Sequence, residues 1–386
     1  MIEPKIRFKK DDGSQYPNLE KMIIKDVMKE RHELRILSDD LPQLSFTIEE
    51  GVILPEDKKT NKRDFLIKDK TTKKYAVTEL NDIIYNPANI KFGAIHRNKL
   101  GRGGVSPIYA IFEPLEDPKY LELYVQRKSF IRKSMRFLEG TVEKLKSLKP
   151  NDFIKLEINL PCKEEQAKIV GFFEYINDVI STGEEEVKQL ENLKKGVIQK
   201  IFSQEIRFKD DNGNDFEEWK EKKLGECLKY EQPSKYLVKS EDYKGCTKYP
   251  VLTANKGFLL GYTDEETGIY NKGKVIIFDD FTCDSKFVNF DFKVKSSAIK
   301  MLTPIDPDDS LECLHAILVN LNFQPESHQR HWISIMAEQD VLVPCKEEQR
   351  KISELINSMN VAIDTAREEL ELYKNLKKGL LQQMFI

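Results

Sequence analysis

Two segments resemble catalytic motifs in their spacing, but each lacks the residue on which its chemistry depends. Gly268 to Lys274 fits a phosphate-binding loop, yet Val275 stands where a Ser or Thr hydroxyl must reach magnesium. Residues 275–278 also read as a strand, whereas such a loop opens a helix. Residues 86–89, Asn-Pro-Ala-Asn, begin like the loop in which adenine methyltransferases hold a flipped base, but the stacking aromatic residue is missing. We therefore expect neither nucleotide hydrolysis nor methyl transfer, and no cofactor.

The cysteines and histidines show no spacing typical of a metal site. The five histidines include the neighbours His328 and His331, but no cysteine or carboxylate pattern completes a site around them. No C-x-x-C pair occurs among the cysteines, which we interpret as reduced thiols; they are Cys162, Cys227, Cys246, Cys283, Cys313 and Cys345. The sequence predicts no metal.

The elements that position the other polar residues are revealed by an internal duplication. Residues 161–169 return as 344–352, and 192–196 return as 375–379, both at an offset of 183. Over residues 161–202 and 344–385, 20 of 42 positions are identical. A second repeat, Ile-Arg-Phe-Lys at residues 6 and 206, marks the start of each unit. The chain therefore consists of a variable domain and a constant segment, each present twice.

Each constant segment has apolar residues that step by four and three, which predicts a long helix with a heptad seam. About 40 residues give a rod of roughly 60 Å whose apolar stripe must be covered, so we expect the two helices to pair antiparallel. Both seams carry lysine at the same place, Lys194 and Lys377. The residues predicted to pair the helices are Ile169, Phe173, Ile176, Ile180, Val187, Leu190, Val197 and Ile201 in the first helix, and Ile352, Ile356, Met359, Ile363, Leu370, Tyr373, Leu380 and Met384 in the second.

The predicted fold class is α+β, with a pseudo-twofold internal repeat. We expect a first domain over 1–158, a first long helix over 159–204, a second domain over 205–341 and a second long helix over 342–386. The N-terminus lacks the apolar core of a secretory signal, and no run of 18 apolar residues occurs, so we expect a cytoplasmic protein.

Basic residues are segregated, although the net charge of -3 at first argues against nucleic acid. Residues 91–104 carry four basic side chains and no acid, and residues 119–149 carry nine against three Glu. Such segregation fits a protein with one face toward phosphate. The alternative is that these are ordinary solvated faces.

The order of variable domain, Pro-x-x-x-Glu-Gln-x-Lys-Ile helix, variable domain and the same helix again resembles the specificity subunits of type I restriction-modification enzymes. The resemblance covers essentially the whole chain, and its sharpest motifs are the helix starts at Pro161 and Pro344 and the two Leu-Lys-Lys-Gly endings. It implies a non-catalytic subunit that reads a split sequence in double-stranded DNA, one domain per half-site. Its helices would set the spacer and dock two methyltransferase subunits, and restriction subunits would join them in the full complex. A self-contained methyltransferase-nuclease and a coiled-coil scaffold or spacer that never touches DNA are the alternatives.

DNA reading requires phosphate contacts and side chains that reach base edges in the major groove. In the first domain the candidates are on a Gly-rich loop and a basic helix: Arg97, Asn98, Lys99, Arg102, Arg127, Lys128, Arg132, Lys133 and Arg136. In the second domain they are Lys235, Tyr236, Asn255, Lys256, Tyr262, Lys286, Arg330 and His331.

Overall fold

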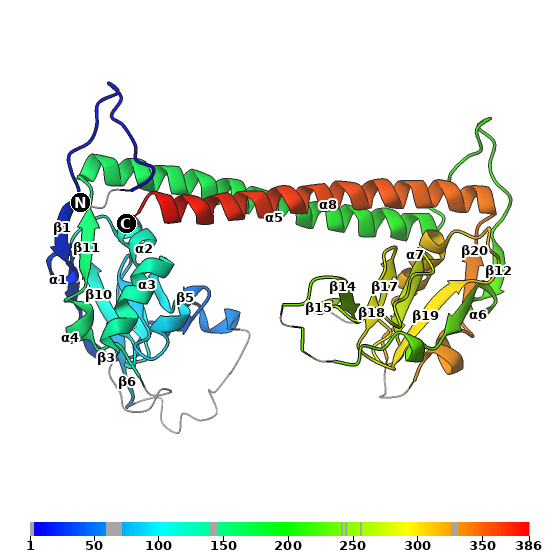
Figure 1. The fold of residues 1–386 in the computed structure, drawn as a ribbon, viewed down its shortest axis with the longest axis horizontal. Coiled ribbons are helices and arrows are strands. Elements are labelled where there is room, and N and C mark those ends of the chain that lie inside the picture. The colour runs from blue at the N-terminus through cyan, green and yellow to red at the C-terminus, as the bar shows by residue number, and fades with distance from the viewer. Residues whose placement is uncertain are drawn as a thin grey trace. The chain divides into compact units, whose positions relative to one another are not determined.

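The computed structural model describes residues 4–58, 72–138, 146–240, 242–243, 245–254, 257–325 and 330–385. They form two compact units, Met1–Thr182 with Glu369–Ile386, and Gly183–Glu368. Both units mix helices and sheets, which confirms the α+β prediction (Figure 1). In the part of the chain described, no helix is long and apolar enough to span a membrane.

The first unit is built on a four-stranded antiparallel sheet that packs against short helices. Its strand order is β2 (Met28–Glu30), β10 (Ala110–Pro114), β7 (Ile83–Tyr85) and β8 (Ile95–Arg97). Beside it lie a three-stranded sheet, a hairpin and a strand pair: β3 (Leu34–Ile36), β6 (Lys74–Thr78) and β9 (Gly103–Val105); β4 (Ser45–Thr47) and β5 (Gly51–Ile53); β1 (Glu20–Ile23) and β11 (Glu157–Leu160). The helices are α1 (Ile24–Val27), α2 (Pro118–Val125), α3 (Lys128–Ser134) and α4 (Pro150–Phe153).

The second unit repeats the topology of the main sheet although its sequence differs. The order is β13 (Leu228–Glu231), β19 (Ile299–Pro304), β16 (Val275–Asp279) and β17 (Ser285–Val288). A three-stranded sheet and a strand pair accompany it: β15 (Leu259–Thr263), β14 (Tyr249–Leu252) and β18 (Lys293–Val294); β12 (Lys220–Lys223) and β20 (Asp340–Val343). The helices are α6 (Leu224–Cys227), α7 (Leu311–Asn320) and a π-helical turn, Trp332–Met336. The strand predicted after Lys274 is confirmed as β16.

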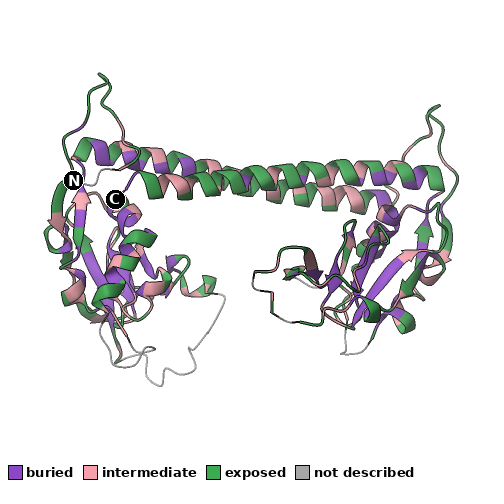
Figure 2. Cartoon of the chain, in the orientation of Figure 1, coloured by how far each residue is buried: buried purple, intermediate pink, exposed green. Residues whose placement is uncertain are grey.

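Apolar strands form the core of each unit, as the burial colours of Figure 2 show. In the first unit the ring of Phe153 lies 4.7 Å from that of Tyr85 and 4.9 Å from that of Phe112. In the second unit all five residues of β16 are buried, and Phe278 meets Trp332 with ring centroids 5.3 Å apart. The central strands are apolar on both sides because helices or a second sheet cover them.

The two long helices are α5 (Lys163–Phe202) and α8 (Lys346–Gln383), and each contributes to both units. In the second unit, Lys194 Nζ donates a hydrogen bond to Asn360 Oδ1 at 2.5 Å, and Arg367 pairs with Glu191, so these parts of the helices run antiparallel. In the first unit, the start of α5 and the end of α8 join one apolar cluster.

The residues predicted to pair the helices lie on the covered side of each helix, with one exception. Fifteen of them are buried or half-buried, whereas Tyr373 is 36% exposed. Tyr373 was therefore placed wrongly in the covered stripe. An exposed position suits a phenol hydroxyl, which would need a hydrogen-bond partner if it were buried.

The short repeat at residues 6–9 and 206–209 anchors the start of each long helix. Arg7 donates to both carboxylate oxygens of Glu165, at 2.8 and 2.7 Å. Arg207 does the same to Glu348, at 3.3 and 2.8 Å. Both glutamates are fully or almost fully buried, so each needs its arginine. The identical sequence motifs are thus explained by identical ion pairs.

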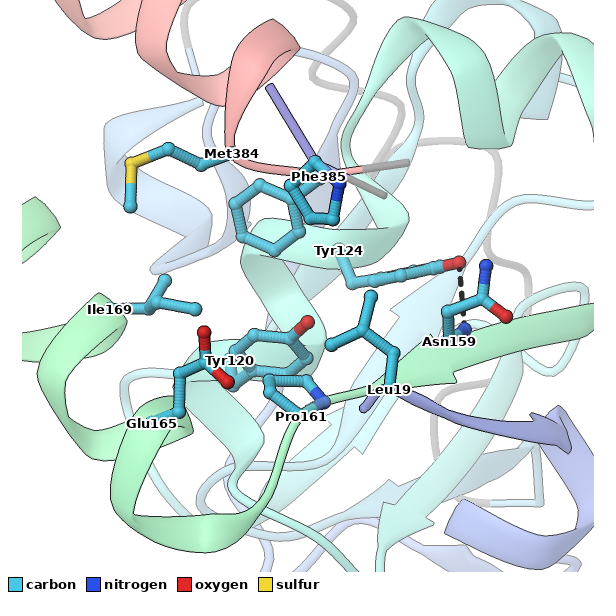
Figure 3. A pocket seen from close by; sticks show the side chains of 10 residues that line it. Leu19, Tyr120, Tyr124, Asn159, Pro161, Glu165, Ile169, Met384 and Phe385 are labelled. Atoms are coloured by element: carbon cyan, nitrogen blue, oxygen red, sulfur yellow. Dashed lines mark hydrogen bonds between the residues drawn. The ribbon is translucent and has the colours of Figure 1, made fainter. Parts of the chain in front are cut away.

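The two residues that follow α8 close the core of the first unit. Met384 and Phe385 are buried and line a small pocket with Tyr120 and Tyr124 (Figure 3). The ring of Phe385 lies 5.5 Å from that of Tyr120 and 6.2 Å from that of Phe173. Ile6 N–H donates to the carbonyl of Gln383 at 3.1 Å, which ties the N-terminal segment to the same place.

Candidate nucleic-acid interface

The short helix α3 presents the clearest cationic surface of the first unit. Its apolar residue Phe130 is buried against Phe153 and Tyr124, which turns the basic side chains outward. Lys128 and Arg132 on α3 are exposed, and so is Arg136 in the 3-10 turn that follows (Met135–Phe137); within the described part of the chain none of the three forms an ion pair. Lys133 is half-buried and pairs with Glu157 at 3.4 Å. We therefore place Lys128, Arg132 and Arg136 first among the candidates for phosphate contact.

The loop after β8 is held by internal hydrogen bonds. Asn98 is fully buried, and its amide donates to Thr78 Oγ1 at 3.0 Å and to the carbonyl of Gly101 at 2.7 Å. Its oxygen accepts the N–H of Leu100 at 3.0 Å. Asn98 thus shapes the loop and cannot reach a base, which corrects the prediction made for it. Its short amide substitutes for backbone partners that a tight loop lacks.

Glu122 on α2 forms ion pairs with the cations Arg97 and Lys99. Arg97 donates to it at 3.1 Å and Lys99 pairs with it at 3.0 Å. The Arg97 side chain is 13% exposed, whereas that of Lys99 is 60% exposed. Arg102 pairs with Glu79 and is 38% exposed. Lys99 and Arg102 can therefore still reach a ligand by exchanging partners, but Arg97 is held in the domain.

Arg127 is a structural residue and not a free cation. It is 7% exposed, and its guanidinium lies 3.8 Å from the ring centre of Tyr124 and 4.9 Å from that of Phe385. Burial lowers the pKa of Arg127. The predicted DNA contact is wrong for this residue, because its guanidinium packs against two aromatic rings.

In the second unit, four predicted side chains reach solvent. Lys235, Lys286 and Arg330 are exposed, and Tyr262 is 40% exposed on the edge strand β15. Asn255 and Lys256 lie outside the described residues.

Two other predictions in this unit are overturned by burial. Tyr236 is 5% exposed, and its hydroxyl donates to Glu231 at 2.9 Å. His331 is 1% exposed, and its Nδ1 lies 3.1 Å from the carbonyl oxygen of Asp280. Both residues pack inside the domain because their polar atoms find partners there.

Sequence reasoning missed a buried polar network that supports Arg330. Asp280 accepts the N–H groups of His331 and Trp332 at 3.2 and 2.8 Å, and its other oxygen lies 3.3 Å from Lys300 Nζ. Lys300 is 1% exposed. The only signal in the sequence was Lys300 between apolar residues of β19, and this signal does not indicate that Asp280 is its partner. The network fixes the chain next to Arg330.

The lysines of the helix seam face their neighbouring domains at equivalent places. Lys194 contributes to lowering the pKa of His315, although burial is the larger cause, and the pKa falls to about 4. Burial likewise lowers the pKa of Lys377, with Lys99 adding to the shift and Glu122 opposing it. His315 also lies 3.1 Å from Ser285 Oγ.

Among the residues that the structure covers, no group of three or more His, Cys, Asp or Glu side chains could hold a metal ion. In the first unit exposed cations lie on α3 and on the loop after β8, and in the second unit Lys286 is exposed on β17. Exposed cations of this kind bind polyanions such as nucleic-acid phosphates.

Residues 216–372 match the model of the type I restriction modification DNA specificity domain. The specificity subunit of the Escherichia coli type I restriction enzyme EcoR124I/EcoR124II is 49% identical over 135 residues, which is 33% of each chain. This match therefore spans about a third of that relative's length.

Solved structures share the fold over the whole chain. The type I restriction-modification S subunit from M. genitalium superposes with a TM-score of 0.56 at 15% identity, covering 100% of this chain and 99% of its own. A chain from work on complex assembly and conformational transition of the type I R-M system gives 0.56 at 15%, covering 96% and 98%.

These findings identify residues 216–372 as a type I restriction modification DNA specificity domain. Outside this domain, the chain as a whole shares its fold with the type I restriction-modification S subunit.

Proposed function

We propose that this chain reads a bipartite DNA target, one half-site for each domain, and performs no catalysis itself. The observation that carries the proposal is the pair of domains with one main-sheet topology and different exposed polar residues. One sheet scaffold with two surfaces suits two unrelated half-sites. The contacts would come from Lys128, Arg132, Arg136, Lys99 and Arg102 in the first unit, and from Lys235, Tyr262, Lys286 and Arg330 in the second.

The long helices would serve as a paired antiparallel coil that sets the spacer between half-sites and docks two methyltransferase subunits. Restriction subunits would join them in the full complex. Support comes from the covered stripe of each helix and from the antiparallel contacts of Lys194 and Arg367 in the second unit. Insertion of one heptad into both helices should lengthen the spacer and leave the half-sites unchanged.

The test is methylome sequencing of cells that express this chain with its cognate methyltransferase subunit. We expect a split motif, of which one half changes when residues 205–341 are exchanged for those of another specificity subunit. A change in both halves, or in neither, would contradict the proposal. Methylation by the purified chain alone would favour a self-contained enzyme. Absence of salt-sensitive DNA binding by the assembled complex would favour a scaffold.

A further inference from the structure

The apolar residues of the long helices do not distinguish unlike helices, α5 with α8, from like helices, two copies of α5 or two of α8. The seam is mostly apolar in both copies of the repeat. The helix ends are equivalent as well. Phe385 is buried in the first unit, and its repeat equivalent Phe202 packs on Trp219 in the second, with ring centroids 5.8 Å apart. By apolar contact alone, two copies of the chain could pair their α5 helices with each other.

Charge distinguishes the two helices near the middle of the repeat. Of the 42 aligned positions, three carry an acid in one copy and a base in the other. Each directly follows a seam position, and they step by four and three, so they lie on one side of the helix beside the seam. They are Glu184, Lys188 and Glu191 in α5, and Arg367, Glu371 and Lys374 in α8.

Two of these positions form an ion pair between the helices. Arg367 donates a hydrogen bond to Glu191, and the two side chains are 54% and 46% exposed. At the offset of 183, Arg367 is equivalent to Glu184 and Glu191 is equivalent to Lys374. In an antiparallel coil of α5 and α8 that keeps this twofold relation, an acid of α5 therefore matches a base of α8 at both places.

Like helices would bring like charges together at the same two places. Two antiparallel α5 helices would set Glu184 of each copy opposite Glu191 of the other, and two α8 helices would set Arg367 opposite Lys374. Four attractive pairs in two unlike coils would thus become four repulsive pairs in two like coils. With each exposed attraction or repulsion worth a factor of about 1.4 to 2, the eight factors favour unlike helices by at least about tenfold.

We propose that these charges select unlike helices as partners, so that every paired coil joins one first domain to one second domain. The inference rests on the proposed function, in which the coil holds two domains over a bipartite target. A coil of two α5 helices would carry the same domain twice and would read two copies of one half-site. Repulsion between like helices therefore keeps the target asymmetric.

The test cuts the chain after it has folded. A protease site is inserted between Ser203 and Gln204 of the full chain, and the folded protein is cleaved there, so that only noncovalent contacts hold its two halves together. Native mass spectrometry then counts assemblies of unlike halves and of like halves. For the original chain, like assemblies should lie at least about tenfold below their statistical share.

Glu191→Lys combined with Arg367→Glu reverses one ion pair and removes the selection. Each helix then carries one acid and one base at the two places, so unlike and like coils have equal numbers of attractive pairs. Like assemblies should rise at least about tenfold, whereas the melting temperature of the uncut chain should stay within about 1 °C. Salt at about 1 M should raise like assemblies of the original chain as well, because it screens exposed charges.

Arg350→Glu combined with Glu354→Arg is the matched control, because it reverses an exposed ion pair that lies within α8 alone. It should leave like assemblies as rare as in the original chain. The inference is overturned if the original chain forms like assemblies at their statistical share. It is also overturned if reversal of the pair between the helices leaves them equally rare, because apolar contacts would then make the selection. If the cut halves of the original chain separate and pair with nothing, the paired coil of the proposed function fails instead.

Discussion

Replacement of Glu348 by alanine should destabilise the second unit selectively. The Glu348 side chain is 0% exposed and accepts two hydrogen bonds from Arg207 and one from Trp219 Nε1, at 2.8 Å. Its removal leaves a buried indole N–H unpaired and deprives Arg207 of its carboxylate. The arginine is 20% exposed and keeps a carbonyl partner in Glu217, so part of its loss is made up. We expect a cost of about 3 kcal/mol.

The assay exploits the position of the two tryptophans, since Trp219 and Trp332 both belong to the second unit. A loss of about 3 kcal/mol should lower the unfolding midpoint measured by tryptophan fluorescence by about 6–12 °C. Glu348→Gln, which keeps one acceptor oxygen, should lose about half as much. Glu165→Ala breaks the equivalent pair in the first unit and should barely move this midpoint. A shift below about 2 °C for Glu348→Ala, or an equal shift for Glu165→Ala, would refute the reasoning.

Three further perturbations address the C-terminal turn, a buried histidine and the basic helix. Phe385→Ala should destabilise the first unit by about 3 kcal/mol, seen as faster hydrogen exchange there, whereas Phe202→Ala should act on the second unit. The pKa of His315 is about 4, below its value of about 6.5 in an unfolded chain, so protonation favours unfolding. The second unit should therefore lose up to roughly 3 kcal/mol as the pH falls from 6.5 to 4, and His315→Gln should flatten this dependence in fluorescence-monitored unfolding. Arg132→Ala should weaken DNA binding by the assembled complex and reduce its salt slope by about 1, whereas Lys220→Ala should change neither.

The periodic parts of the fold could be predicted from the sequence alone. The heptad pattern predicts which side of each long helix is covered, because residues spaced by three and four positions lie on one side of a helix. The strand after Lys274 was equally plain, since Val-Ile-Ile-Phe is apolar and consists of β-branched and aromatic residues. The predicted burial of Tyr373 was wrong because spacing alone takes no account of the polar hydroxyl on its ring.

The polar site was harder to predict because charge in a sequence does not reveal burial. Arg127 and Arg132 lie on one basic stretch, yet the first stacks on aromatic rings and the second is exposed. Asn98 reads as a loop residue fit for a base, but it satisfies the loop itself. Asp280 and Lys300 are 20 residues apart, and only the sheet register brings them together.

The seam lysines explain how one helix design can serve two different domains. Counting five residues from the N-caps Asp117 and Ser310 places Glu122 on α2 and His315 on α7 at equivalent positions. Electrostatically, Lys377 acts on Glu122 in the first unit, and Lys194 acts on His315 in the second. An apolar residue at this position would only pack against the partner helix. Lys194 instead donates a hydrogen bond to Asn360 and also acts electrostatically on the domain. The same seam position therefore meets a carboxylate in one domain and an imidazole in the other, so one repeated helix accommodates two different side chains there.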